Sequence, residues 1–423
     1  MAISSLTKLV PGTRQLAFNK FIQILKQETI PLEIIDVQGQ TWETVPGNIR
    51  HRLMIRDHRF FNALLSPNAY SLGSAYINGY FDVSGNMREL YEMVCDKLLS
   101  TDQSGKISAF FSKMVSPVLA LLPSGIREKE KENIRYQYDQ PGRFFRIFLG
   151  ETMGYTCGYY SDQNSSMSDA QNKKMEIVCK KLRLTSGEHL LDIGCGWGNL
   201  SVYAAKHYGV KVTGITLSQE QKTYAEEWIK KEGLAGQVKI KLLNYRDLEN
   251  NQYDKIACVG MSEHVGRDNM STFYDTVYSC LKPGGLFMQH TITTYSQPKK
   301  SRNNLFLDTY MFPGGELMRE QDLVDLAGQS GFELLNAENF RPHYVKTLAD
   351  WISRMEQHRD QLIDIVDETT YRIYHVFFIG SLISFRQKEI ALFQNLFCKT
   401  GSGIEGDHLF TTPYAETTSF TVE

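Results

Sequence analysis

Strand-like and helical segments alternate along the chain from Leu184 onward. Five segments have the pattern of strands: His189–Ile193, Lys211–Ile215, Val238–Leu243, Lys255–Val259 and Gly285–Thr291. Three segments with helical spacing of apolar residues lie between them: Leu200–His207, Gln219–Lys231 and Ser271–Leu281. Strands that alternate with helices are typical of a doubly wound sheet. The pattern therefore predicts an α/β domain.

Four further elements are expected toward the C-terminus. They are a strand near Phe332–Asn336, helices over Trp351–Val366 and Tyr371–Phe385, and a final strand, Ile390–Phe397. We expect this larger domain to occupy residues 133–405 and to be followed by a loosely held tail at 406–423.

The first part of the chain has the pattern of a separate, smaller α+β domain, residues 1–103. Strands are expected at Leu32–Val37, Thr41–Val45 and His51–Ile55, and a helix at Met87–Leu99. Residues 104–132, which combine an apolar piece (Met114–Leu122) with a charged run, are interpreted as a connector. The apolar piece either packs against a domain or acts as an interfacial membrane anchor.

Composition narrows the class of protein. A chain of 423 residues is long enough for two domains, and 42% hydrophobic with 22% charged residues is typical of soluble globular proteins. The formal net charge of −2 gives no general attraction to nucleic acid. No signal peptide or membrane-spanning run is evident, and the seven cysteines form no metal-binding spacing, so a cytoplasmic protein without a metal is expected.

A glycine-rich turn follows the first strand of the larger domain. The segment runs Asp192-Ile193-Gly194-Cys195-Gly196-Trp197-Gly198 and leads into a helix. Glycines let the backbone bend sharply and approach a ligand closely, as a nucleotide loop at the first strand–helix turn requires. Since no GxxxxGK[ST] is present, a phosphate-binding P-loop is excluded.

The end of the second strand lacks the acidic residue that usually holds a ribose. Thr216, Leu217, Ser218 and Gln221 stand there instead, and Thr216 and Gln221 are polar substitutes for the acid. A simple helix N-cap at Ser218 is the structural alternative, and it is compatible with ribose binding. After the third strand, Tyr245 and Arg246 lie where methyltransferases hold adenine.

The glycine turn resembles that of class I S-adenosylmethionine methyltransferases, and further segments make the resemblance specific. With Thr216–Gln221, four segments closely resemble the cyclopropane-fatty-acyl-phospholipid synthases and their mycolic acid relatives: Met153–Tyr160, Ser262–Gly266, Gln289–Ile292 and Phe312–Leu317. The resemblance extends from about Asn133 to Phe397, and Leu72–Val83 is similar to the lipid-side domain of the full-length bacterial enzymes. It implies a Rossmann-like domain with a seven-stranded sheet, accompanied by that smaller domain.

The resemblance also implies a reaction and a set of site residues. The enzymes add a methylene unit from S-adenosylmethionine to the cis double bond of acyl chains, through a carbocation that a bound bicarbonate deprotonates. They work as dimers at the phospholipid membrane surface, which implies a cytoplasmic protein peripherally associated with the inner face of the membrane. By resemblance, Cys157, Glu263, His290, the backbone of Ile292 and Tyr344 surround the bicarbonate, while Tyr155 and Thr156 join the glycine turn in holding the cofactor.

Several alternatives remain open on the sequence. Cys157 alone could be a small buried hydrophobe, and an isolated Glu-His pair could lie in a solvated loop. The basic residues of Lys299–Arg302 either are solvated or anchor the chain to anionic headgroups. A methyl-branching enzyme, a small-molecule N-methyltransferase and an inactive lipid-binding protein are the alternative functions.

Overall fold

The computed structural model describes residues 13–65, 69–98, 140–249, 253–295, 310–311 and 316–399. The expected connector (104–132), the basic cluster at Lys299–Arg302 and the expected tail (406–423) lie outside these described residues. The chain divides into two compact units. The first comprises Met1–Asn133, Ser301–Met311 and Asp367–Ile379, and the second comprises Ile134–Lys300, Phe312–Val366 and Gly380–Glu423.

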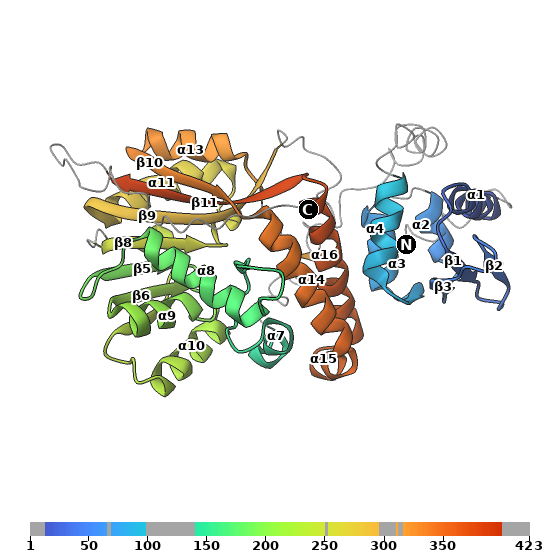
Figure 1. Ribbon diagram of the computed structural model, residues 1–423, viewed down its shortest axis with the longest axis horizontal. Helices are drawn as coiled ribbons and strands as arrows, with labels where there is room; N and C mark the ends of the chain where they lie inside the picture. Colours follow the sequence, from blue (N-terminus) through green and yellow to red (C-terminus); the bar gives the residue numbers. More distant parts are fainter. Residues whose placement is uncertain are drawn as a thin grey trace, which may run out of the picture. The chain divides into compact units, whose positions relative to one another are not determined.

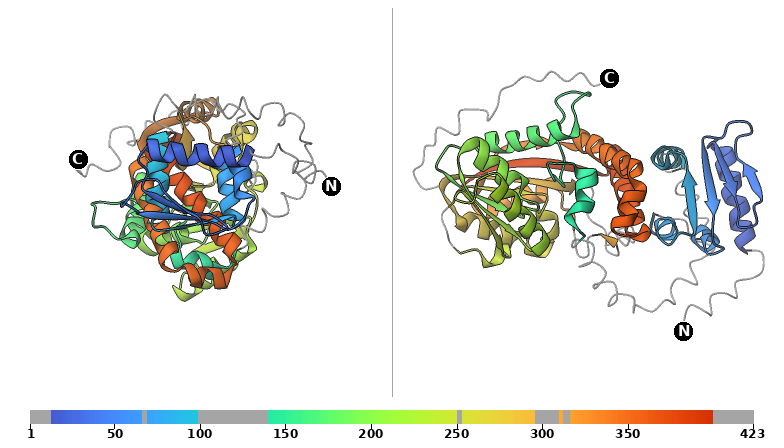
Figure 2. Two further views of the ribbon diagram at one scale, coloured as in Figure 1. Left: turned by 90° about the vertical axis from the view of Figure 1, so that its right-hand side faces the viewer. Right: turned by 90° about the horizontal axis from the view of Figure 1, so that it is seen from below.

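The first unit contains a four-stranded sheet with the order β2-β1-β3-β4, and α1 lies alongside it (Figure 2). Strand β1 pairs antiparallel with β2 and parallel with β3, and β3 pairs antiparallel with β4. The strands are β1 (Leu32–Ile35), β2 (Thr41–Glu43), β3 (His51–Ile55) and β4 (Phe81–Ser84). The helices are α1 (Thr13–Gln27), α2 (Phe60–Leu65), α3 (Ala69–Ile77) and α4 (Met87–Leu98).

The beginning of α16 (Glu368–Arg386) belongs to the first unit. The buried guanidinium of Arg372 donates to the carbonyl oxygens of Tyr76 at 2.9 Å and Phe81 at 3.2 Å, and it forms an ion pair with Asp82. An arginine that satisfies backbone carbonyls and a carboxylate at once is a strong tether, because its donors form a rigid fork. This arginine therefore joins the N-terminal residues to a helix that lies about 300 positions later in the chain.

The second unit contains a seven-stranded sheet with the order β10-β11-β9-β8-β5-β6-β7, which confirms the expected number of strands (Figure 1). Strands β7, β6, β5, β8 and β9 are parallel, whereas β11 runs antiparallel between β9 and β10. The strands are β5 (His189–Ile193), β6 (Lys211–Thr216), β7 (Val238–Leu242), β8 (Tyr253–Val259), β9 (Leu281–Thr294), β10 (Phe332–Asn339) and β11 (Ile390–Lys399).

Helices cover both faces of this sheet. Figure 1 shows α11 and α13 on one face and α8, α9 and α10 on the other, and each layer has its own cluster of buried apolar side chains. The helices of this unit are α7 (Gly142–Leu149), α8 (Met167–Lys181), α9 (Asn199–Tyr208), α10 (Gln219–Lys231), α11 (Arg267–Cys280), α13 (Glu320–Gln329), α14 (Arg341–Gln357) and α15 (Arg359–Ile365). Short 3-10 turns, η2 (Tyr245–Asp247) and η3 (Ser262–His264), follow β7 and β8.

The expected strands and helices of the larger domain are present, whereas α7, α8 and α13 were not expected. The single helix expected over Trp351–Val366 is two helices, α14 and α15, which meet at His358, whose φ of −115° and ψ of 27° are not helical. Helix α14 also begins ten residues before the expected start, because a proline in its first turn suits a helix N-terminus. Among the described helices, none is long and apolar enough to cross a bilayer.

Candidate active site

The turn after β5 bends in a way that only glycine tolerates. Gly194 has a φ of +73°, and a Cβ there would lie 2.5 Å from the Cβ of Met261. Gly196 also has a positive φ, +53°, but no heavy atom lies within 4 Å of the place its Cβ would occupy. A backbone that is bent toward empty space is open to a close ligand. The turn at Gly196 therefore has room for a cofactor.

The side chains of this turn point into the protein. Cys195 and Trp197 are buried, and the Trp197 ring packs against Phe145 of α7 and Tyr224 of α10, with ring centroids 5.3 Å apart in both cases. The third glycine, Gly198, packs against α10 and begins α9. Cofactor contact at this turn would thus come from backbone groups, while the tryptophan holds α7 over the turn.

Asp192, the residue before the last of β5, is buried. It accepts a hydrogen bond of 2.7 Å from the hydroxyl of Ser201, and burial raises the pKa of Asp192 to about 6. The positive charge of the buried Lys174 on α8 favours the ionised form of Asp192, and burial lowers the pKa of that lysine to about 8. The opposite charges of a buried acid and a buried base partly offset the cost of desolvating each of them.

The expected ribose-binding residues lie together at the end of β6. The hydroxyl of Thr216 donates to Oε1 of Gln221 at 2.7 Å, which leaves the amide nitrogen of Gln221 available as a donor. Ser218 is the N-cap of α10 and accepts from the backbone N–H of Gln221 at 3.2 Å. The Leu217 side chain is 71% exposed. The cap and the polar pair therefore coexist, as the sequence allowed.

The expected adenine-binding residues lie in η2, after β7. Tyr245 is buried against Phe273, and the Arg246 guanidinium lies 4.7 Å from the centre of the Tyr245 ring. The Asn244 side chain accepts from the backbone N–H of Arg246 and fixes the turn. Burial raises the pKa of Tyr245. Arginine over an aromatic ring forms a flat platform that a purine could extend.

Helix α8 holds the segment that contains Tyr155, Thr156 and Cys157. The amide nitrogen of Gln171 donates to the carbonyl oxygen of Thr156 at 2.7 Å, and the Lys174 ammonium donates to the Thr156 hydroxyl at 2.8 Å. The Tyr155 ring packs on Trp351 of α14, with centroids 5.4 Å apart. Three helical side chains thus fix this otherwise irregular segment at the site.

Glu263 lies in η3, directly after β8. Its Oε1 accepts the backbone N–H of Ile292 at 2.8 Å, whereas its Oε2 is buried without a hydrogen-bond partner among the described residues. Burial raises the pKa of Glu263 to about 7. A carboxyl group with this pKa is poised to donate or accept a proton near neutrality.

His290 lies on β9 and is 1% exposed. Its Nδ1 is 3.1 Å from the amide nitrogen of Gln394 on β11, and its Nε2 is buried without a partner among the described residues. Burial, together with the positive charges of Lys174 and Lys181, lowers the pKa of His290 well below its ordinary value. The ring is therefore neutral at physiological pH.

Phe340, at the start of α14, connects the remaining site residues. The Cys157 sulfur lies 3.9 Å from the Phe340 carbonyl oxygen, and the Phe340 ring contacts the His290 ring with centroids 5.8 Å apart. One helical turn later, burial raises the pKa of Tyr344, and the charges of Cys157 and Glu263 act in the same direction. These contacts link Cys157, Glu263, His290, Ile292 and Tyr344 near the ends of β8 and β9, and the carboxyl edge of an α/β sheet is where such proteins bind ligands.

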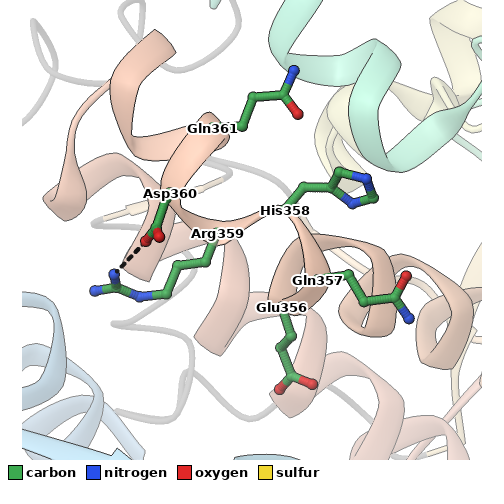
Figure 3. Close-up of a pocket in the computed structure, with 6 residues that line it drawn as sticks. All are labelled: Glu356, Gln357, His358, Arg359, Asp360 and Gln361. Carbon is green, nitrogen blue, oxygen red and sulfur yellow. Dashed lines mark hydrogen bonds and ion pairs between the residues drawn. The ribbon is translucent and has the colours of Figure 1, made fainter.

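A shallow surface hollow elsewhere does not belong to this region. Its lining residues run from Glu356 to Gln361 around the junction of α14 and α15 (Figure 3). Helical rise of about 1.5 Å per residue separates Glu356 from Tyr344 by roughly 18 Å. None of the expected site residues lines this hollow.

Four polar residues at the site were not expected from the sequence. Lys174 and Gln171 lie on α8, Gln394 on β11, and Thr347 of α14 accepts the backbone N–H of Gly158 at 3.0 Å. The sequence feature that could have indicated them is a polar residue at a position that faces the core. Burying a polar side chain costs free energy unless the side chain is hydrogen-bonded. Gln394 carries that signal within an apolar strand.

Comparisons with known proteins identify the family. The model of the family described as mycolic acid cyclopropane synthetase matches residues 126–395. The chain belongs to this family. It is therefore an S-adenosylmethionine-dependent methyltransferase, as the glycine turn and the seven-stranded sheet indicate.

Individual relatives within the family cover most of the chain. A protein described as a probable fatty acid methyltransferase from Pseudomonas putida is 33% identical over 88% of this chain and 92% of its own length. The cyclopropane-fatty-acyl-phospholipid synthase of Escherichia coli is 31% identical over 84% of this chain and 89% of its own. The solved structure of the cyclopropane synthase MmaA2 from Mycobacterium tuberculosis has a TM-score of 0.61 at 29% identity, and the match covers 66% of this chain and 99% of that one.

Proposed function

We propose that this enzyme transfers a methylene unit from S-adenosylmethionine to the cis double bond of unsaturated phospholipid acyl chains, forming cyclopropane fatty acids. The observation that carries the proposal is the pair of buried polar atoms without partners, Glu263 Oε2 and His290 Nε2, beside Cys157 and Tyr344. Unsatisfied buried polar atoms are rare in folded proteins and call for a ligand or an ordered water. Their position at the carboxyl edge of the sheet is where α/β proteins bind substrates.

The proposed chemistry balances in two steps. The alkene π electrons attack the sulfonium methyl carbon, the carbon–sulfur bond breaks with its electrons going to sulfur, and a carbocation forms on the chain. A proton then leaves the added methyl group, and the electrons of that C–H bond close the three-membered ring. An alkene is a poor nucleophile, so the site must exclude water and hold the two reactants close together.

The proton acceptor we propose is a bound bicarbonate. When bound, it would supply the base that takes the methyl proton. The polar atoms fit such a small anion: Glu263 with a pKa near 7 can donate a hydrogen bond from Oε2, the neutral His290 ring can donate from Nε2, and the Tyr344 hydroxyl stays protonated. These residues would hold the anion and shield it from water, while the backbone N–H of Ile292 fixes the orientation of the Glu263 carboxyl group.

We also propose a place of action for this enzyme. It would work as a homodimer, peripherally bound to the cytoplasmic face of a phospholipid membrane, because its substrate would be an acyl chain within a bilayer. The Escherichia coli relative covers 84% of this chain, so its match extends beyond the second unit into the first, for which we propose the lipid-side role.

Methyl branching is the second candidate function. It is favoured by the relative from Pseudomonas putida, described as a probable fatty acid methyltransferase, which covers 88% of this chain. Branching would use the same methyl transfer and the same carbocation but would lose a proton from the chain rather than from the added methyl group.

One experiment separates these candidates. The protein is incubated with S-adenosylmethionine and vesicles of cis-monounsaturated phosphatidylglycerol, with and without added bicarbonate, and the acyl chains are analysed by mass spectrometry and proton NMR. We expect a mass gain of one methylene, cyclopropane ring protons, and a rate that rises with bicarbonate. A branched methyl signal would support the second candidate, and no modified chain would refute both.

A further inference from the structure

We infer that Gln394 is a positioning residue that sets the tautomer of His290, so that the ring carries its proton on Nε2 and presents a hydrogen-bond donor to an anion. This inference rests on the proposed function, since the anion is the bicarbonate proposed above. It assigns a role to a residue of β11, a strand that contributes no side chain to the expected site.

The first argument is the geometry of the two strands. Gln394 and His290 are directly paired in the antiparallel register of β11 and β9, and their side chains are 0% and 1% exposed. The amide nitrogen of Gln394 lies 3.1 Å from Nδ1 of the ring. In this orientation of the amide its nitrogen donates, so Nδ1 accepts, and in a neutral ring the single proton is then on Nε2.

The second argument is the charge around the ring. Lys174 and Lys181 of α8 are the charged groups that act on His290, and both disfavour a cationic imidazolium. The apolar ring of Phe340, directly before α14, contacts the His290 ring with centroids 5.8 Å apart. A neutral ring has one donor and one acceptor, so the partner of Nδ1 decides what Nε2 presents.

The third argument is the cost of placing glutamine at this position. The Oε1 atom of Gln394 is buried without a partner among the described residues. A buried carbonyl without a hydrogen bond is destabilising, and an apolar side chain of similar volume would avoid that cost. The hydrogen bond to His290, rather than packing in the sheet, therefore explains why residue 394 is a glutamine.

The test measures the tautomer directly. The full chain is labelled with ring-15N histidine, and the His290 signals are assigned by their loss in His290→Gln. In the wild-type protein at pH 7 we expect a protonated Nε2 and an unprotonated Nδ1. In Gln394→Glu, a carboxylate at this position accepts from the ring, so Nδ1 is expected to gain a proton. A wild-type ring with its proton on Nδ1, or a Gln394→Glu ring unchanged from wild type, would overturn the inference.

A functional measurement accompanies the spectra. In Gln394→Leu we expect the bicarbonate concentration for half-maximal activity to rise about tenfold, with the Kd for S-adenosylmethionine within about twofold of wild type. The matched control is Gln289→Leu, which removes an equally buried glutamine next to His290 whose side chain instead accepts from Tyr274. It should leave the His290 signals and the bicarbonate dependence unchanged.

The two proposals fail separately. Activity of the wild-type protein that is independent of bicarbonate would contradict the proposed anion, whatever the tautomer. A clear bicarbonate dependence that is equal in wild type and Gln394→Leu would leave the proposed function standing and refute the role of Gln394.

Discussion

The buried carboxyl group of Glu263 should make the stability of the protein depend on pH. The perturbation is Glu263→Gln, which keeps an oxygen to accept the Ile292 N–H and places an amide nitrogen where Oε2 stands. The variant therefore preserves the local geometry and removes only the ability to ionise.

The magnitude follows from the raised pKa. Burial moves the pKa of Glu263 from 4.5 to about 7, so ionisation is harder in the folded than in the unfolded protein. The contribution of Glu263 to the free energy of unfolding is therefore complete below pH 4.5 and is lost as the pH rises through 7. Since a tenfold change in acidity corresponds to about 1.36 kcal/mol, wild type should lose about 3 kcal/mol relative to Glu263→Gln between pH 4.5 and pH 8.

Thermal unfolding of the ligand-free protein at several pH values is the assay. A loss of about 3 kcal/mol corresponds to a Tm difference of roughly 6–12 °C for a unit of this size. The matched control is Glu320→Gln, because burial also raises the pKa of Glu320 to about 7 but that residue, on α13, is none of the expected site residues. Both variants should flatten the pH dependence, and only Glu263→Gln should abolish turnover. Parallel pH curves for wild type and Glu263→Gln would refute the raised pKa.

Four further substitutions test three separate parts of the structure. Gly194→Ala should lower the Tm by the equivalent of about 2 kcal/mol, because its Cβ meets a neighbouring side chain. Gly196→Ala meets no atom and should cost only about 1 kcal/mol, but it should weaken S-adenosylmethionine binding more than tenfold by calorimetry. Full affinity in Gly196→Ala would exclude the turn as the cofactor site. Thr216→Val, which removes the hydroxyl bonded to the first-turn glutamine of α10, should raise the KM for S-adenosylmethionine about fivefold at constant kcat; a fall in kcat alone would contradict a binding role. Arg372→Met should cost the first unit about 3 kcal/mol in urea unfolding, since carbonyls and a carboxylate lose their partner; an unchanged midpoint would show that the tether is not stabilising.

Much of the second unit was predictable because apolar residues recur at different spacings in its strands and in its helices. The segment His189–Ile193 and the helix Gln219–Lys231 have the predicted bounds, since apolar runs and capping residues define them locally. The junction of α14 and α15 was not predictable from periodicity, because the apolar pattern continues through His358 while the backbone does not.

The site was predictable only where residues lie in a local motif. Glu263 and His290 follow or end strands, and the resemblance pointed to them directly. Gln394 and Lys174 were missed because nothing near them in sequence indicates their partners. Gln394 contacts His290 through antiparallel pairing across about a hundred residues, and Lys174 reaches Thr156 from a helix that otherwise packs on the sheet. Such contacts join residues that are far apart in the sequence, so local sequence patterns do not indicate them.

The central claim is that a methyl carbon from S-adenosylmethionine reaches the acyl chain at the site formed by Cys157, Glu263, His290, Ile292 and Tyr344. The most direct measurement supplies donor with a 13C-labelled methyl group to vesicles of cis-monounsaturated phosphatidylglycerol, and locates the label by NMR in wild type and in Glu263→Gln. The account predicts 13C in the acyl chain with the wild-type protein and none with the variant, although both bind the donor. Label on the headgroup, or equal labelling of the chain by both proteins, would contradict it.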